Sequence, residues 1–145
     1  ANDQAIEYVV RPFDDYEQLE NELVGADVLL VYEQERNGPM VAIGERWEET
    51  LRLFLGGGGR VIIMDFSGGT WQLANAAGIF PITGLRSVST STPLQVFAPQ
   101  LPIFDDVSNP YPASNGTTAA VTTEPAYIVI GTDDTSAGVG LFRAY

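Results

Sequence analysis

Two uninterrupted apolar runs stand out in the first half of the chain, Val28 to Tyr32 and Val61 to Met64. Neither run alternates with polar residues, a pattern typical of parallel strands that are covered on both faces. A shorter apolar cluster, Ile6 to Val10, predicts another strand, which Arg11 and Pro12 end. The pattern therefore predicts three strands before residue 65.

Segments with helical spacing separate these runs. Between Asp15, a capping residue, and Gly25, apolar side chains share one face of a predicted helix. Val41 to Leu55 predicts a second helix, because Ile43, Trp47 and Leu51 recur at helical intervals. Four consecutive glycines, residues 56–59, end that helix just before the second apolar run.

The pattern changes after Thr70. The segment WQLANAAG predicts a short helix ended by Gly78, and SVSTSTPLQVF is typical of strand and loop. Prolines at positions 102, 110 and 112 indicate a long irregular excursion between Gln100 and Thr123. The closing segment AYIVIGTDDTSAGVGLFRAY predicts two strands that form a hairpin around Thr132 to Ala137.

The order strand, helix, strand, helix, strand predicts a single α/β domain over residues 1–145 with right-handed crossovers and a mostly parallel sheet. At 145 residues and 45% hydrophobic content, the chain is long enough for one core. Its apolar runs are far shorter than the roughly 20 residues of a membrane helix, so we expect a soluble protein without membrane insertion. The first residue, Ala1, suggests a module of a longer protein or a processed, extracytoplasmic one.

Charge and composition narrow the functions that this fold could serve. Nineteen acidic residues oppose seven basic ones, all arginine, for a formal charge of −12. This balance argues against nucleic-acid binding, because no basic patch could neutralise a run of phosphates. The chain has no cysteine and no histidine, which excludes thiolate chemistry, Cys-based zinc sites and Ser-His-Asp or Cys-His mechanisms. We expect no cofactor.

Several phrases along the chain, ADVLLVY, FLGGGGRVIIMDF, LPIFDDV and AYIVIGTDD, resemble the class I glutamine amidotransferase-like superfamily. More narrowly, they resemble its non-amidotransferase branches, such as the ThuA-like proteins. The resemblance covers about Ile6 to Tyr145 and implies a flavodoxin-like three-layer sandwich. Where amidotransferases carry their nucleophilic cysteine, on the turn after a central strand, this chain has Asp65, Phe66 and Ser67. The resemblance therefore does not extend to amidotransferase catalysis.

The same turn is the first candidate site, because open α/β sheets bind ligands beyond the carboxyl ends of their strands. Its amides and hydroxyls could hold an anion or another small polar ligand. The competing interpretation is structural: glycines that supply positive φ, followed by Thr70 as a helix cap. The residues of this candidate are Asp65, Ser67, Gly68, Gly69, Thr70 and Trp71.

An acidic loop forms the second candidate. Glu33 and Glu35 follow the strand Val28 to Tyr32 and would lie near Asp65 if the two strands were neighbours. Carboxylates gathered there could bind Mg²⁺ or Ca²⁺, or act as an acid/base pair. In so acidic a chain, a solvated loop is the simpler explanation.

These observations leave two functions in competition. The missing catalytic residues favour a non-catalytic amidotransferase-like domain that acts in ligand binding or protein assembly, with another chain or domain along an exposed sheet edge. The alternative is a ThuA-like enzyme or sugar-binding protein that uses the acidic site at the carboxyl end of the sheet.

Overall fold

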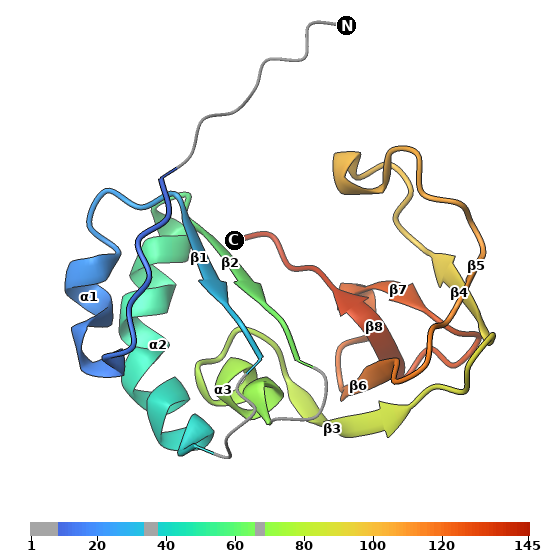
Figure 1. Ribbon diagram of the computed structural model, residues 1–145, viewed down its shortest axis with the longest axis horizontal. Helices are drawn as coiled ribbons and strands as arrows, with labels where there is room; N and C mark the ends of the chain where they lie inside the picture. The colour runs from blue at the N-terminus through green and yellow to red at the C-terminus, as the bar shows by residue number, and fades with distance from the viewer. Residues whose placement is uncertain (1–8, 34–37, 66–68) are drawn as a thin grey trace, which may run out of the picture.

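The computed structural model describes residues 9–33, 38–65 and 69–145. The chain forms an α/β half, up to about the start of β3, and a β-rich half after it (Figure 1). The elements of the α/β half are the 3-10 turn η1 (Tyr16–Gln18), α1 (Leu19–Glu22), β1 (Val28–Val31), α2 (Met40–Gly56), β2 (Arg60–Ile63) and α3 (Thr70–Ala76).

From β1 to α3, the α/β half follows the order that the sequence predicts. The strands within 28–32 and 61–64 and the helix over 41–55 are confirmed as β1, β2 and α2. β1 and β2 pair in parallel, with Leu30 opposite Ile62. The strand predicted over Ile6 to Val10 lies mostly outside the described residues, and Val9 and Val10 are not in a strand.

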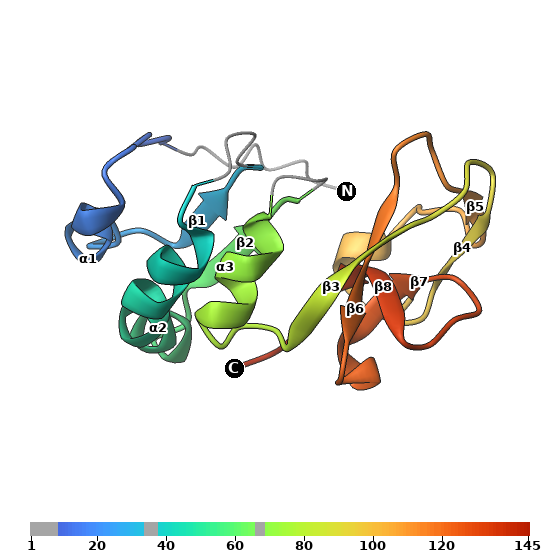
Figure 2. The same ribbon diagram turned by 90° about the horizontal axis from the view of Figure 1, so that it is seen from below.

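A single apolar cluster packs the three helices against one face of this small sheet (Figure 2). Leu51 of α2 is fully buried and Leu73 of α3 is 2% exposed. The indole of Trp47 is also buried, and its Nε1 donates a 2.7 Å hydrogen bond to the carbonyl oxygen of Tyr16. The repeating apolar residues of α2 thus form the surface on which α1 and α3 pack.

The β-rich half is a six-stranded sheet in the order β3-β6-β8-β7-β4-β5, in which every pair of neighbours is antiparallel. Two 3-10 turns, η2 and η3, interrupt the connections. The elements are β3 (Ile82–Ser87), β4 (Pro93–Val96), η2 (Pro102–Phe104), β5 (Tyr111–Pro112), β6 (Thr118–Thr122), η3 (Pro125–Tyr127), β7 (Ile128–Gly131) and β8 (Ala137–Leu141).

The prediction of a mostly parallel, flavodoxin-like three-layer sandwich is therefore wrong. The chain is α/β, but its main sheet is antiparallel, and β1 with β2 is the one parallel pair in the part of the chain that the structure describes. The physical reason lies after Ala76, where no α-helix separates the described strands, and parallel pairing needs a long crossover. The C-terminal hairpin is confirmed by the antiparallel pairing of β7 and β8.

The helices of the described residues are too short or too polar to cross a membrane.

Candidate functional site

The turn between β2 and α3 uses its carboxylate to hold the start of the helix. Asp65 Oδ2 accepts a hydrogen bond of 2.8 Å from the backbone nitrogen of Trp71. That amide lies in the first turn of α3, where backbone donors have no partner inside the helix. Gly69 is the N-cap residue, in the left-handed region at φ 83°, and has no side chain to cap with. Asp65 therefore supplies the acceptor that the N-cap position lacks.

The second carboxylate oxygen of Asp65 is withdrawn from solvent. Oδ1 is buried and has no hydrogen-bond partner among the residues that the structure describes. With Oδ2 bonded to an amide and Oδ1 buried, the carboxylate is positioned as part of the turn.

The other predicted residues of this turn are placed as follows. Thr70 is the first residue of α3 rather than its N-cap, and its side chain is fully buried. The side chain of Trp71 is half-buried. Ser67 and Gly68, the other two predicted residues of this site, lie outside the described residues.

Glu33, the described acid of the predicted acidic loop, lies at the expected edge of the small sheet. Because β1 and β2 are parallel neighbours, Glu33 and Asp65 follow strands that end on the same side. Glu35 lies outside the described residues, and among those that are described no three acidic side chains gather as metal ligands would. The divalent-cation site stays a prediction.

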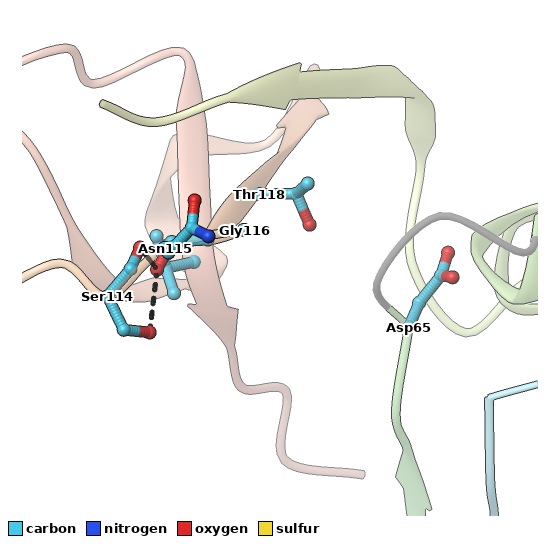
Figure 3. A pocket seen from close by; sticks show the side chains of 7 residues that line it. Asp65, Ser114, Asn115, Gly116 and Thr118 are labelled. Carbon is cyan, nitrogen blue, oxygen red and sulfur yellow. Dashed lines mark hydrogen bonds between the residues drawn. The ribbon is translucent and has the colours of Figure 1, made fainter. Parts of the chain in front are cut away.

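A cavity of about 280 Å³ opens between the two halves, a feature that sequence reasoning missed. Figure 3 shows Asp65 on one side and the loop Ser114 to Thr118 on the other. The Thr117 hydroxyl donates a 2.9 Å hydrogen bond to the carbonyl oxygen of Ser114, which fixes the loop's turn. The side chain of Asn115 is exposed at the cavity. Hydroxyl and amide groups in this arrangement suit a small ligand with several hydrogen-bonding groups.

A second polar cluster closes the hairpin between β7 and β8. Arg86 of β3 pairs with Asp134, whose Oδ1 also accepts hydrogen bonds from the amide and the hydroxyl of Ser136, at 2.9 and 2.6 Å. The Ser136 donors, together with Arg86, lower the pKa of Asp134 to about 2. Arg86 and Asp134 line a smaller hollow of about 190 Å³.

The feature of greatest consequence is the face of the β1–β2 sheet that no described helix covers, here called the outer face. Side chains alternate along β1: Leu29 is 4% exposed, whereas Leu30 is 39% exposed. The prediction that both faces of these strands are covered is therefore wrong for the described chain. The apolar residues of the outer face are Val28, Leu30, Tyr32, Ile62 and Met64.

Comparisons with protein-family models, curated proteins and solved structures found no match. The resemblance to the amidotransferase-like superfamily therefore stays a prediction.

Proposed function

We propose that the chain is a non-catalytic domain that acts in protein assembly, with the outer face as its docking surface. The observation that carries this proposal is the exposure of five apolar side chains on two adjacent strands, between 39% and 64% of each residue's surface. Parallel strands are found almost only where both faces are covered. The outer face therefore has the composition of an interface rather than of a solvated surface.

The edges of the small sheet support the same proposal. In the described chain, β1 pairs only with β2, and β2 only with β1, so each has one unpaired edge. A two-stranded sheet is only marginally stable when nothing else covers it. A partner that covers the outer face would stabilise β1 and β2 as well as bind to them.

The chemistry of the chain supports a non-catalytic role. The sequence contains neither cysteine nor histidine, which serve as the nucleophile and the general base in amidotransferase-like active sites. The carboxylate at the expected active-site turn, Asp65, caps α3.

The test is site-specific photo-crosslinking in cells that make the protein, with benzoylphenylalanine in place of Ile62. Leu53 provides the matched control, because it is an apolar residue of α2 with 60% exposure that lies outside the outer face. We expect a discrete cross-linked product from position 62 and none from position 53. No product at 62, or the same products at both positions, would overturn the proposal.

The cavity beside Asp65 favours a second candidate function, binding of a small polar ligand such as a sugar. Calorimetry against a panel of sugars, with Mg²⁺ and Ca²⁺ as further ligands, tests it. Asn115→Ala is the informative variant, because Asn115 lines the cavity without capping a helix. Heat that is absent, or that is the same with Asn115→Ala, would rule out this cavity as the site.

A further inference from the structure

The loop that faces Asp65 across the cavity carries an asparagine followed by a glycine, Asn115 and Gly116 (Figure 3). Asparagine is one of the chemically labile residues of proteins. Its side-chain carbonyl carbon can close a small ring with the backbone nitrogen of the next residue. Glycine in that next position leaves the nitrogen unhindered, because it has no Cβ. The chemistry of this step in the loop therefore deserves a closer look at its surroundings.

Both groups that would react are free in the described chain. Asn115 is exposed, and Gly116 is half-buried. Among the described residues, no hydrogen bond uses the side-chain amide of Asn115 or the backbone nitrogen of Gly116. The two groups can approach each other without the loss of a hydrogen bond.

The turn is closed by the residues on either side of this step. The backbone nitrogen of Thr117 donates a 3.3 Å hydrogen bond to the carbonyl oxygen of Ser114, and the Thr117 hydroxyl donates a second one, of 2.9 Å, to the same oxygen. Gly116 lies in the left-handed region, at φ 82°. Turns that differ only in the rotation of their central peptide keep the same closing hydrogen bond. The peptide between Asn115 and Gly116 can therefore rotate while the turn stays closed.

Asn109 shows the opposite arrangement on a neighbouring loop. Its Oδ1 accepts a 3.0 Å hydrogen bond from the backbone nitrogen of Val96, and its Nδ2 donates one of 3.1 Å to the carbonyl oxygen of Val96. The next residue is Pro110, whose nitrogen carries no hydrogen. Asn109 is therefore held in place and lacks a nucleophile beside it.

We propose that Asn115 is a site of spontaneous deamidation through a cyclic imide. The nitrogen of Gly116 loses its proton to solvent base and attacks Cγ of Asn115. The bond from Cγ to Nδ2 breaks, and Nδ2 takes up a proton and leaves as ammonia. Water then adds to one of the two ring carbonyls and opens the ring, which yields aspartate or isoaspartate. The reaction goes beyond the proposed function and does not depend on the docking surface.

The product changes the chemistry of the cavity. Either acid places a carboxylate on the loop opposite Asp65, where the intact chain has a neutral amide. Isoaspartate also adds a methylene to the backbone of the loop. Two carboxylates around one cavity attract cations and repel anions.

The test is incubation of the folded chain at mildly alkaline pH, with peptide mapping by tandem mass spectrometry at intervals. The mapping assigns each deamidated position, and so separates Asn115 from Asn109 and from Asn37, which also precedes a glycine and lies outside the described residues. A synthetic peptide of residues 111–121, incubated alongside, gives the rate of the same step without the fold. Circular dichroism at the start and the end verifies that the chain stays folded.

We expect Asn115 to react in the folded chain at a rate within about tenfold of that in the peptide, and Asn109 to stay intact. Gly116→Ala should slow the reaction at least about tenfold, because the added methyl hinders the attacking nitrogen. Asn115→Gln should abolish it at this position, since the longer side chain does not close the same ring.

Two results would overturn the proposal. One is a rate in the folded chain that is more than about tenfold below that of the peptide, which would mean that the fold protects Asn115. The other is a rate that Gly116→Ala leaves unchanged. The comparison of wild-type chain and peptide needs no variant, so it decides the question even if a substitution disturbs the loop.

Discussion

At the scale of single residues, glycine positions in α2 show how closely the helices of the α/β half pack. A Cβ added at Gly44 would lie 2.6 Å from the carbonyl oxygen of Leu73 and 2.7 Å from the Cβ of Ala76. Both neighbours belong to α3, so the absence of a side chain at Gly44 sets the distance between the two helices. Gly56, at the end of the same helix, would meet nothing within 4 Å.

Gly44→Ala should lower the free energy of unfolding by about 1–3 kcal/mol, because the added methyl forces α2 and α3 apart. Gly56→Ala adds the same methyl to open space and should cost nothing, or stabilise the helix by up to about 1 kcal/mol. Urea unfolding followed by tryptophan fluorescence measures both. Equal stabilities for the two variants would contradict the close contact between the helices.

The candidate site could be predicted from the sequence only in part, and Asp65 shows why. Its position after a buried strand was readable from the apolar run that precedes it. Its bond to the Trp71 amide was not, because either interpretation of the turn, ligand site or helix cap, requires the same polar and glycine residues. The facing loop, Ser114 to Thr118, comes from a strand connection some fifty residues later, and its turn residues indicate only a loop.

At the scale of elements, the two faces of β1 should respond differently to the same substitution. Leu29, 4% exposed, belongs to the apolar cluster, whereas its neighbour Leu30 is 39% exposed on the outer face. Leu29→Ala should cost about 2–5 kcal/mol of unfolding free energy, because it leaves a cavity among the helices. Leu30→Ala should cost well under that, about 1 kcal/mol or less.

Chemical denaturation of the purified chain measures this pair. A large loss in Leu30→Ala would mean that some part of the chain already covers the outer face in solution, and would argue against a docking surface there.

The β7–β8 hairpin should make stability depend on pH in the acidic range. The pKa of Asp134 falls from 3.8 to about 2 in the folded chain, because Ser136 and Arg86 stabilise its carboxylate. The unfolded chain therefore binds a proton more readily, and the contribution of Asp134 is present above about pH 4 and lost as the pH falls from about 4 to about 2. Asp134→Asn should flatten the fall of melting temperature across this window.

Asp105→Asn is the matched control, since Asp105 is an exposed acid on the loop after η2. It should leave the pH profile as steep as in the wild type. If both variants flatten the profile equally, general charge repulsion rather than the hairpin cluster governs acid stability.

Element prediction succeeded where local pattern and packing agree. The apolar repeat of α2 gave its length and its buried face, because Ile43, Trp47 and Leu51 all pack in the cluster. The prediction of two-sided burial failed for β1. An uninterrupted apolar run shows only that a strand could be covered on both faces, and in the described chain Val28 and Leu30 stay 45% and 39% exposed.

At the scale of the whole molecule, the pairing between strands distant in sequence could not be predicted from the sequence. β3 pairs with β6, and β6 with β8, and the connections between them are too long and irregular to indicate which strands pair. Such pairing depends on which strands meet in space, and no local periodicity reports it. The parallel arrangement of β1 and β2 was predictable because a helix directly joins them.

The two halves are joined where the C-terminal segment returns to the end of α3. Arg143 Nη1 donates 3.1 Å hydrogen bonds to the carbonyl oxygens of Gly78 and Ile79. Its guanidinium also lies over the rings of Tyr127 and Tyr145, at 5.4 and 4.5 Å from their centroids. Phe80 is the last residue along the chain that packs against the apolar cluster of the α/β half. The contacts of Arg143 are therefore among the main noncovalent interactions between that half and the antiparallel sheet.

Arg143→Met should therefore uncouple the unfolding of the two halves. Trp47 and Trp71 are the two tryptophans of the chain and report on the α/β half, while hydrogen exchange measured by mass spectrometry reports on β6 to β8. In the wild type the two signals should share one urea midpoint, as expected of a cooperative domain. In Arg143→Met the midpoints should separate, because methionine keeps most of the aliphatic part of the side chain but cannot donate the hydrogen bonds to Gly78 and Ile79.

The matched control is Arg52→Met, which breaks an ion pair within α2 and should keep the midpoints together. If the midpoints also separate in Arg52→Met, or do not separate in Arg143→Met, Arg143 does not couple the two halves.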